Sequence, residues 1–76
     1  MRLMEFKMER PDLVKVGDKV EITEGQLPFS WYYTIEPAVA MSGNIPLTER
    51  LFATEGQIME IKSSDVGYYL TVGFEE

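Results

Sequence analysis

Cysteine and histidine are both absent from this chain of 76 residues. Their absence excludes disulfides, thiol nucleophiles, metal sites built on thiolate or imidazole ligands, and every mechanism that uses an imidazole base. A domain of this size without covalent or metal cross-links depends on close packing or on self-association for its stability. We therefore expect no cofactor, no metal and a protein that is not an enzyme.

Positive charge is scarce as well. Seven Lys and Arg residues stand against 13 Asp and Glu residues, so the net charge is −6. This balance repels nucleic-acid phosphates and anionic lipids unless the cations gather on one face, and in the sequence they are scattered. The chain has no run of about 18 apolar residues, and its charged first residues do not resemble a secretory signal. We expect a cytoplasmic protein with no membrane span, for which nucleic acid is an unfavoured partner.

The clearest pattern that the chain does contain lies between Thr54 and Glu76. Residues 57–62 and 68–74 have strand-forming composition, and residues 63–67 between them have the composition of a turn. The second arm has an apolar residue at every second position, namely Tyr68, Leu70, Val72 and Phe74. This two-residue period is typical of a half-buried strand, so we predict a β-hairpin.

Two further strands are predicted nearer the middle of the chain. One runs from Lys19 to Thr23 after a turn or bulge at Gly17-Asp18, and a turn at residues 23–26 closes it. The other runs from about Phe29 to Glu36, where aromatic and β-branched residues alternate with polar ones.

The segment from Pro37 to Ala53 has the least regular pattern, and its conformation is left open. Residues 37–46 are predicted to form a long loop whose tip is Ser42-Gly43-Asn44. Residues 46–52 favour a short helical turn that feeds a strand near Phe52, followed by a bulge at Gly56.

Residues 1–11 are predicted to be an N-terminal arm or an edge strand. Met4, Phe6 and Met8 alternate with charged residues, but Pro11 interrupts the pattern because it cannot donate to a strand ladder. We therefore place a single domain at residues 12–76.

Three segments together resemble small SH3-like barrels, including those of the KOW type. They are Gly17-Asp18-Lys19-Val20-Glu21-Ile22, Glu55-Gly56-Gln57-Ile58-Met59-Glu60-Ile61 and Tyr69-Leu70-Thr71-Val72-Gly73-Phe74. The resemblance covers about half of the chain and concerns turns and core positions, so it implies a fold more than a chemistry. The implied fold is mainly all-β, a partly open barrel of about five antiparallel strands.

The aromatic cluster at residues 29–33 has two interpretations. Phe29, Trp31 and Tyr33 fill the barrel core, or Trp31 and Tyr32 line a groove that receives a proline-rich or extended peptide. Tyr32 and Tyr69 are the best surface candidates because each lies on the polar face of its strand. In and just after the long loop, Met41, Ile45 and Leu47 offer an apolar contact for a partner or a second copy. The candidate partner-binding residues are therefore Trp31, Tyr32, Tyr69, Met41 and Ile45.

These observations favour a small acidic protein–protein interaction module without enzymatic activity, whose partner is another protein or a second copy of the chain. The alternative is a nucleic-acid-associated regulator of the KOW type. A third reading is a carboxylate dyad of Glu21 and Glu60, which hold equivalent places in two strands, against the simpler interpretation that both are solvated charges.

Overall fold

A computed structural model describes residues 1–37 and 39–76 of the chain. In this part of the molecule, strands are the dominant element, and the one helical segment is a 3-10 turn, η1 (Leu47–Glu49). The seven strands are β1 (Arg2–Met8), β2 (Lys19–Leu27), β3 (Ser30–Ile35), β4 (Ala40–Ser42), β5 (Ile45–Pro46), β6 (Glu55–Ser64) and β7 (Gly67–Phe74). No described helix has the length and apolar character needed to cross a membrane.

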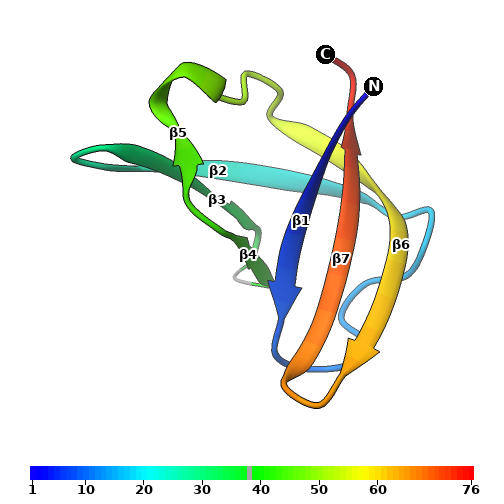
Figure 1. The fold of residues 1–76 in the computed structure, drawn as a ribbon. Helices are drawn as coiled ribbons and strands as arrows, with labels where there is room; N and C mark the ends of the chain where they lie inside the picture. The colour runs from blue at the N-terminus through cyan, green and yellow to red at the C-terminus, as the bar shows by residue number, and fades with distance from the viewer. Residues whose placement is uncertain (38) are drawn as a thin grey trace.

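The strands form one antiparallel sheet that closes on itself. Its order is β2-β6-β7-β1-β4-β3, and β3 pairs back to β2 (Figure 1). β5 pairs with the same edge of β3 as β4 does, nearer the turn between β2 and β3. The all-β class is therefore confirmed, with six strands in the barrel where the sequence predicts about five. This architecture is compatible with SH3-like and OB-like barrels.

The barrel interior is entirely apolar in the described residues. Phe6 and Phe74 are fully buried, and their rings meet with centroids 6.3 Å apart and planes tilted by 47°. Such a tilted contact is a favourable aromatic geometry. The buried hydrophobic residues are Met4, Phe6, Met8, Val20, Ile22, Tyr33, Ile35, Ala40, Leu51, Ile58, Leu70, Val72 and Phe74.

The predicted C-terminal hairpin is confirmed as β6 and β7, joined at Asp65-Val66. Its bulge lies at Met59, between Ile58 and Glu60, and the prediction of a bulge at Gly56 is wrong. Gly56 has another role: a Cβ there would lie 2.6 Å from a ring carbon of Phe74. The glycine lets β6 approach the core closely.

The strand predicted within residues 1–11 is present as β1, but it is not an edge strand. β1 pairs with β7 along its whole length and with β4 at Phe6 and Lys7, so it has a neighbour on each side. Met4, Phe6 and Met8 are buried. A small chain without cross-links needs the apolar area of these three side chains, and this need outweighs the break at Pro11.

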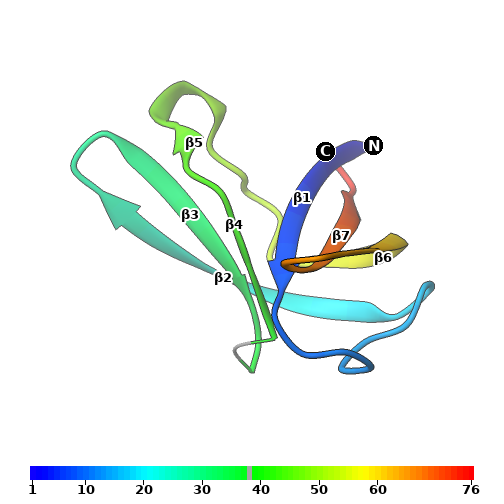
Figure 2. The same cartoon turned by 60° about the horizontal axis from the view of Figure 1, so that its bottom comes forward.

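The ribbon of β2 and β3 is longer than the sequence predicts. The turn lies at Pro28-Phe29, and the predicted turn at residues 23–26 is strand instead. Gly25 faces Tyr32 across the ribbon, and the Tyr32 ring occupies the space that a Cβ on Gly25 would need. Aromatic packing over the glycine thus keeps the strand continuous, and the ribbon extends beyond the barrel (Figure 2).

The predicted loop tip at Ser42-Gly43-Asn44 is also wrong, because β4 and β5 both pair with β3 on either side of it. The Ser42 hydroxyl accepts a hydrogen bond from the N–H of Tyr33 at 2.9 Å, which replaces a ladder bond where the extra residue sits. Of the predicted loop, Ala38 lies outside the described residues. The predicted helical turn is confirmed as η1, but no strand forms at Phe52.

Candidate functional site

Large apolar side chains are exposed together on one face of the β2–β3 ribbon. Phe29 is 87% exposed in the turn between β2 and β3, and Trp31 follows it two residues later as the second residue of β3. The Trp31 Nε1–H donates to the carbonyl of Leu47 at 3.3 Å, which attaches η1 to this face. Phe52, 75% exposed, continues the same side of the molecule. We call Phe29, Trp31, Leu47 and Phe52 the aromatic surface.

Arg50 lies at the centre of the aromatic surface. Its guanidinium carbon is 4.4 Å from the centre of the Trp31 ring and 5.4 Å from that of Phe52. Both are cation–π distances. The same guanidinium donates two hydrogen bonds to the carboxylate of Glu24, at 2.9 and 2.8 Å. These two hydrogen bonds hold the planar guanidinium of Arg50 beside both rings.

The pKa values of this pair move in the directions expected for a hydrogen-bonded ion pair. The Arg50 hydrogen bonds lower the pKa of Glu24, helped by the Tyr33 hydroxyl and opposed by burial. The hydrogen bonds to Glu24 raise the pKa of Arg50. Burial raises the pKa of Tyr33. At neutral pH the cluster therefore contains a carboxylate, a guanidinium and a neutral phenol.

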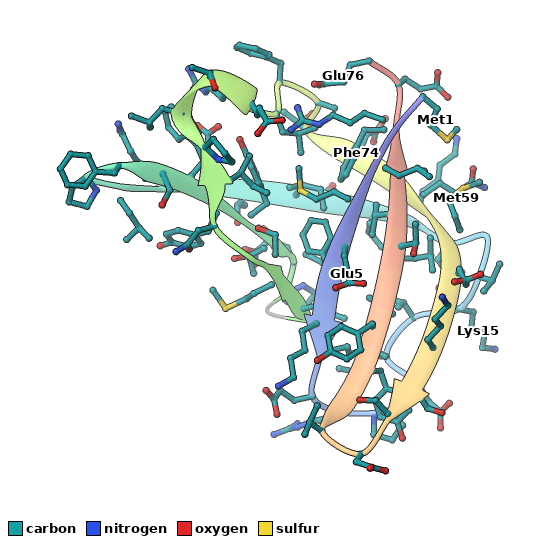
Figure 3. The ribbon with its side chains drawn as sticks, in the orientation of Figure 1. Met1, Glu5, Lys15, Met59, Phe74 and Glu76 are labelled. Carbon is teal, nitrogen blue, oxygen red and sulfur yellow. The ribbon has the colours of Figure 1, made fainter. Side chains whose placement is uncertain are left out.

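The two ends of the chain hold the segment that carries Arg50 and Phe52. Glu76 accepts hydrogen bonds from the N–H groups of Phe52 and Ala53 at 3.0 and 2.8 Å. Arg2 donates to the carbonyl of Arg50 at 3.2 Å and forms an ion pair with Glu76 at 3.3 Å. Figure 3 shows Glu76 at the same end of the molecule as Met1. Both termini thus position one side of the aromatic surface.

A small pocket of about 180 Å³ lies beside this cluster, and Glu24, Arg50 and Phe52 are among its lining residues. Pockets that bind small molecules usually measure about 300–1,000 Å³, so this pocket suits one side chain better than a metabolite. Among the described residues, no group of three Asp or Glu side chains lies close enough together to hold a metal ion.

The structure brings together two of the predicted partner-binding residues, Trp31 and Ile45. They face each other across β3 and β5, and both pack partly against the core. The interpretation of residues 29–33 as core therefore applies fully to Tyr33, partly to Trp31, and not to Phe29.

The other three predicted residues, Tyr32, Met41 and Tyr69, lie on the outer face of the barrel. Met41 and Tyr69 flank Lys7 on β1 in one cross-strand row. Tyr32 is separated from Tyr69 by β4 and β1, three strand spacings or about 14 Å. Tyr32 and Tyr69 therefore do not form one surface patch.

The proposed carboxylate dyad is not formed. Glu21 lies opposite Glu55 in the ladder, whereas Glu60 lies opposite Thr71. Glu60 forms an exposed ion pair with Lys62 at 3.3 Å. The simpler interpretation of solvated charges fits this geometry.

Sequence reasoning missed Glu24, Arg50 and Phe52. One signal was present, because Arg50 is the sole cation between Lys19 and Lys62. Comparisons of the chain with protein-family models, with curated proteins and with solved structures found no match. The geometry is therefore the basis for assigning a function.

Proposed function

We propose that this chain is a protein-interaction module without enzymatic activity, and that it binds its partner through the aromatic surface. The observation that supports this proposal is the exposure of Phe29 and Phe52, at 87% and 75%, on either side of the ordered Trp31–Arg50 stack. Aromatic residues and Arg are enriched in protein interfaces and in their binding hot spots. Burying each phenylalanine against a partner would contribute about 1.5–3 kcal/mol.

Charge favours a basic partner. Four ion pairs occupy four of the seven cations but only four of the 13 acidic residues. The remaining carboxylates outnumber the remaining cations, so a basic protein is steered towards the molecule. A second copy with the same charge of −6 is repelled. The cytoplasmic location remains a prediction.

The same charges weigh against the alternative of a KOW-type nucleic-acid regulator. Arg50 lies beside rings on which bases could stack, but Glu24 neutralises it, and Glu76 neutralises Arg2. Binding to single-stranded nucleic acid combines such rings with free cations. An oligonucleotide that binds at low salt and dissociates steeply as salt rises would favour the alternative.

The proposal is tested by panning a phage-displayed library of random dodecapeptides against the immobilised protein. We expect enrichment of basic peptides that contain apolar residues. Their affinity should fall at least about tenfold, or about 1.4 kcal/mol, in Phe29→Ser and in Phe52→Ser. The matched control is Leu3→Ser, which removes a side chain of similar character that is 59% exposed on β1. No enrichment, or equal losses in all three variants, would contradict the proposal.

A further inference from the structure

Within the part of the chain that the structure describes, one side of β2 has no partner strand between Thr23 and Leu27. β2 pairs with β6 only at Lys19–Glu21, and from Ile22 onwards it pairs with β3 alone. Figure 2 shows this part of β2 on the outside of the projecting ribbon, with β3 between it and β5. We call the side of residues 23–27 that faces away from β3 the free edge.

The register shows which backbone groups point out of the free edge. In an antiparallel ladder, residues alternate between those bonded to the facing strand and those whose N–H and C=O point away from it. The Ile22 N–H belongs to the second set, because it donates to the Thr54 carbonyl at 2.8 Å on the side away from β3. Glu24 and Gln26 follow at two-residue steps, so their N–H and C=O groups point the same way. No hydrogen bond in the described residues uses these groups.

The free edge lacks the devices that usually prevent edge pairing. Natural edges are protected by Lys, Pro, bulges or very short length. Residues 23–27 contain neither Lys nor Pro, their pairing with β3 is regular, and five residues span about 17 Å. The one charge, Glu24, is turned towards Arg50. An exposed edge of this kind is a template for another strand.

The surface beside the free edge also has places that could receive the side chains of such a strand. The small pocket lined by Ile22, Glu24 and Phe52 lies at the barrel end of the free edge. At the far end, Leu27 and Phe29 are exposed. Side chains on one face of an added strand would therefore meet the pocket and those on its other face would meet Leu27, while its backbone bonds to Glu24 and Gln26.

We propose that the free edge binds an extended, basic segment of a partner protein, which adds as one more strand beside β2. This inference rests on the proposed function and names the form of its partner. Backbone hydrogen bonds supply affinity in such complexes, and pockets for alternate side chains supply specificity. The basic character follows from the charge of −6 and the surplus of unpaired carboxylates, which also disfavours a second copy.

The test uses the dodecapeptides enriched by panning and compares Gln26→Pro with Gln26→Ala. Proline removes the outward N–H of Gln26, for which residues 1–37 and 39–76 offer no acceptor, whereas alanine keeps it. We expect peptide affinity to fall at least about tenfold in Gln26→Pro and to stay within about twofold in Gln26→Ala. Thermal melting of both variants shows whether the fold is kept.

A second measurement does not depend on a substitution. In the wild-type protein at saturating peptide, hydrogen exchange of the Glu24 and Gln26 amides should slow at least about tenfold. N-methylation of alternate peptide residues in one register, and not in the other, should abolish binding.

The outcomes separate the two proposals. If peptide binding depends on Phe29 and Phe52 but leaves the Glu24 and Gln26 amides unprotected from exchange, the proposal of strand addition is overturned. The proposed function as an interaction module would still hold. Absence of any enriched peptide would overturn both. Protection of these amides in the free protein at high concentration, with a doubled mass in sedimentation, would identify a second copy as the occupant and overturn the basic partner.

Discussion

The hydroxyl oxygen of Tyr33 accepts a hydrogen bond from the backbone N–H of Leu51 at 2.7 Å, and the two residues are only 1% and 3% exposed. The same hydroxyl donates to the Glu24 carboxylate at 3.0 Å. One phenol thus joins the β2–β3 ribbon to the segment between η1 and β6. Because Arg50 immediately precedes Leu51, this contact also sets the position of the Arg50 stack.

Replacing Tyr33 by Phe removes this hydroxyl while keeping the buried ring. The Leu51 N–H is then buried without a partner, so we expect the free energy of unfolding to fall by about 1–3 kcal/mol. Urea denaturation followed by far-UV circular dichroism measures the change. The control is Tyr69→Phe, because no hydrogen bond to the Tyr69 hydroxyl occurs in the described residues. Equal effects of the two substitutions would contradict the role given to the Tyr33–Leu51 bond.

The packing of Tyr32 over Gly25 predicts a non-additive pair of substitutions. A methyl group at residue 25 displaces the Tyr32 ring, and overpacking of this kind costs about 1–3 kcal/mol. In a Tyr32→Ala background the ring is gone, so we expect Gly25→Ala to cost little there. A double-mutant cycle measured by urea denaturation gives the coupling energy directly.

Gly43→Ala is the matched control for this cycle, since nothing lies within 4 Å of a Cβ at that position. Gly56→Ala provides the opposite extreme, with a Cβ 2.6 Å from Phe74 and 2.9 Å from the backbone oxygen of Gly73. We expect stability to decrease in the order Gly43→Ala, Gly25→Ala, Gly56→Ala. If the effects of Gly25→Ala and Tyr32→Ala on the free energy of unfolding are additive, the packing of the Tyr32 ring does not depend on the glycine.

A strand that pairs with the next strand along the chain could be predicted from the sequence. The β6–β7 hairpin combines strict alternation with a polar turn, and both signals are local. The place of β1 could not be found in this way. Its pairing with β7 joins residues about 70 positions apart, and a period-two pattern does not state whether one or both edges are occupied.

Turn-forming composition gave a wrong prediction at two places, and the physical reason is the same for both. Gly25 and the Ser42-Gly43-Asn44 segment have turn-forming composition, but in the structure a side chain compensates at each place. The Tyr32 ring covers Gly25, and the Ser42 hydroxyl bonds the Tyr33 N–H. Tertiary contacts therefore override local preference.

As partner-binding residues of the candidate site, only Trp31 and Leu47 were predicted, because its other parts come from distant segments. Alternation identifies Glu24 as a residue on the same face as Ile22, but it cannot show that Arg50 returns to meet it. Exposure of Phe29 follows from its place in a two-residue turn, which the sequence assigned to strand.

The inner position of β1 predicts a large loss of stability for one substitution on that strand and almost none for another. Phe6 is fully buried between β7 and β4, so Phe6→Ala should cost about 3–5 kcal/mol. Leu3 points outwards, and Leu3→Ala should change stability by less than about 0.5 kcal/mol. Thermal melting and urea denaturation measure both. A stable Phe6→Ala protein would mean that residues 1–11 are a dispensable arm after all.

The ion pairs at the aromatic surface predict a loss of stability in acid. The Arg50 hydrogen bonds lower the pKa of Glu24 from its ordinary value of 4.5. Burial opposes the same change at Glu76, but the N–H groups of Ala53 and Phe52 and the Arg2 guanidinium outweigh it and lower that pKa too. A carboxylate with a lowered pKa stabilises the folded state above the pKa of the unfolded chain. This contribution is lost as pH falls from about 4.5 through the folded-state pKa.

We therefore expect the free energy of unfolding to decrease below about pH 4.5 and to decrease less steeply in Glu24→Gln, which cannot bind that proton. Urea denaturation at a series of pH values from neutral to acid measures both slopes. In the wild type, Trp31 fluorescence should change over the same pH range, because protonation of Glu24 releases Arg50 from the ring. If the stability of Glu24→Gln falls with pH as steeply as that of the wild type, other carboxylates cause the loss. The Arg50 stack would then not depend on the charge of Glu24.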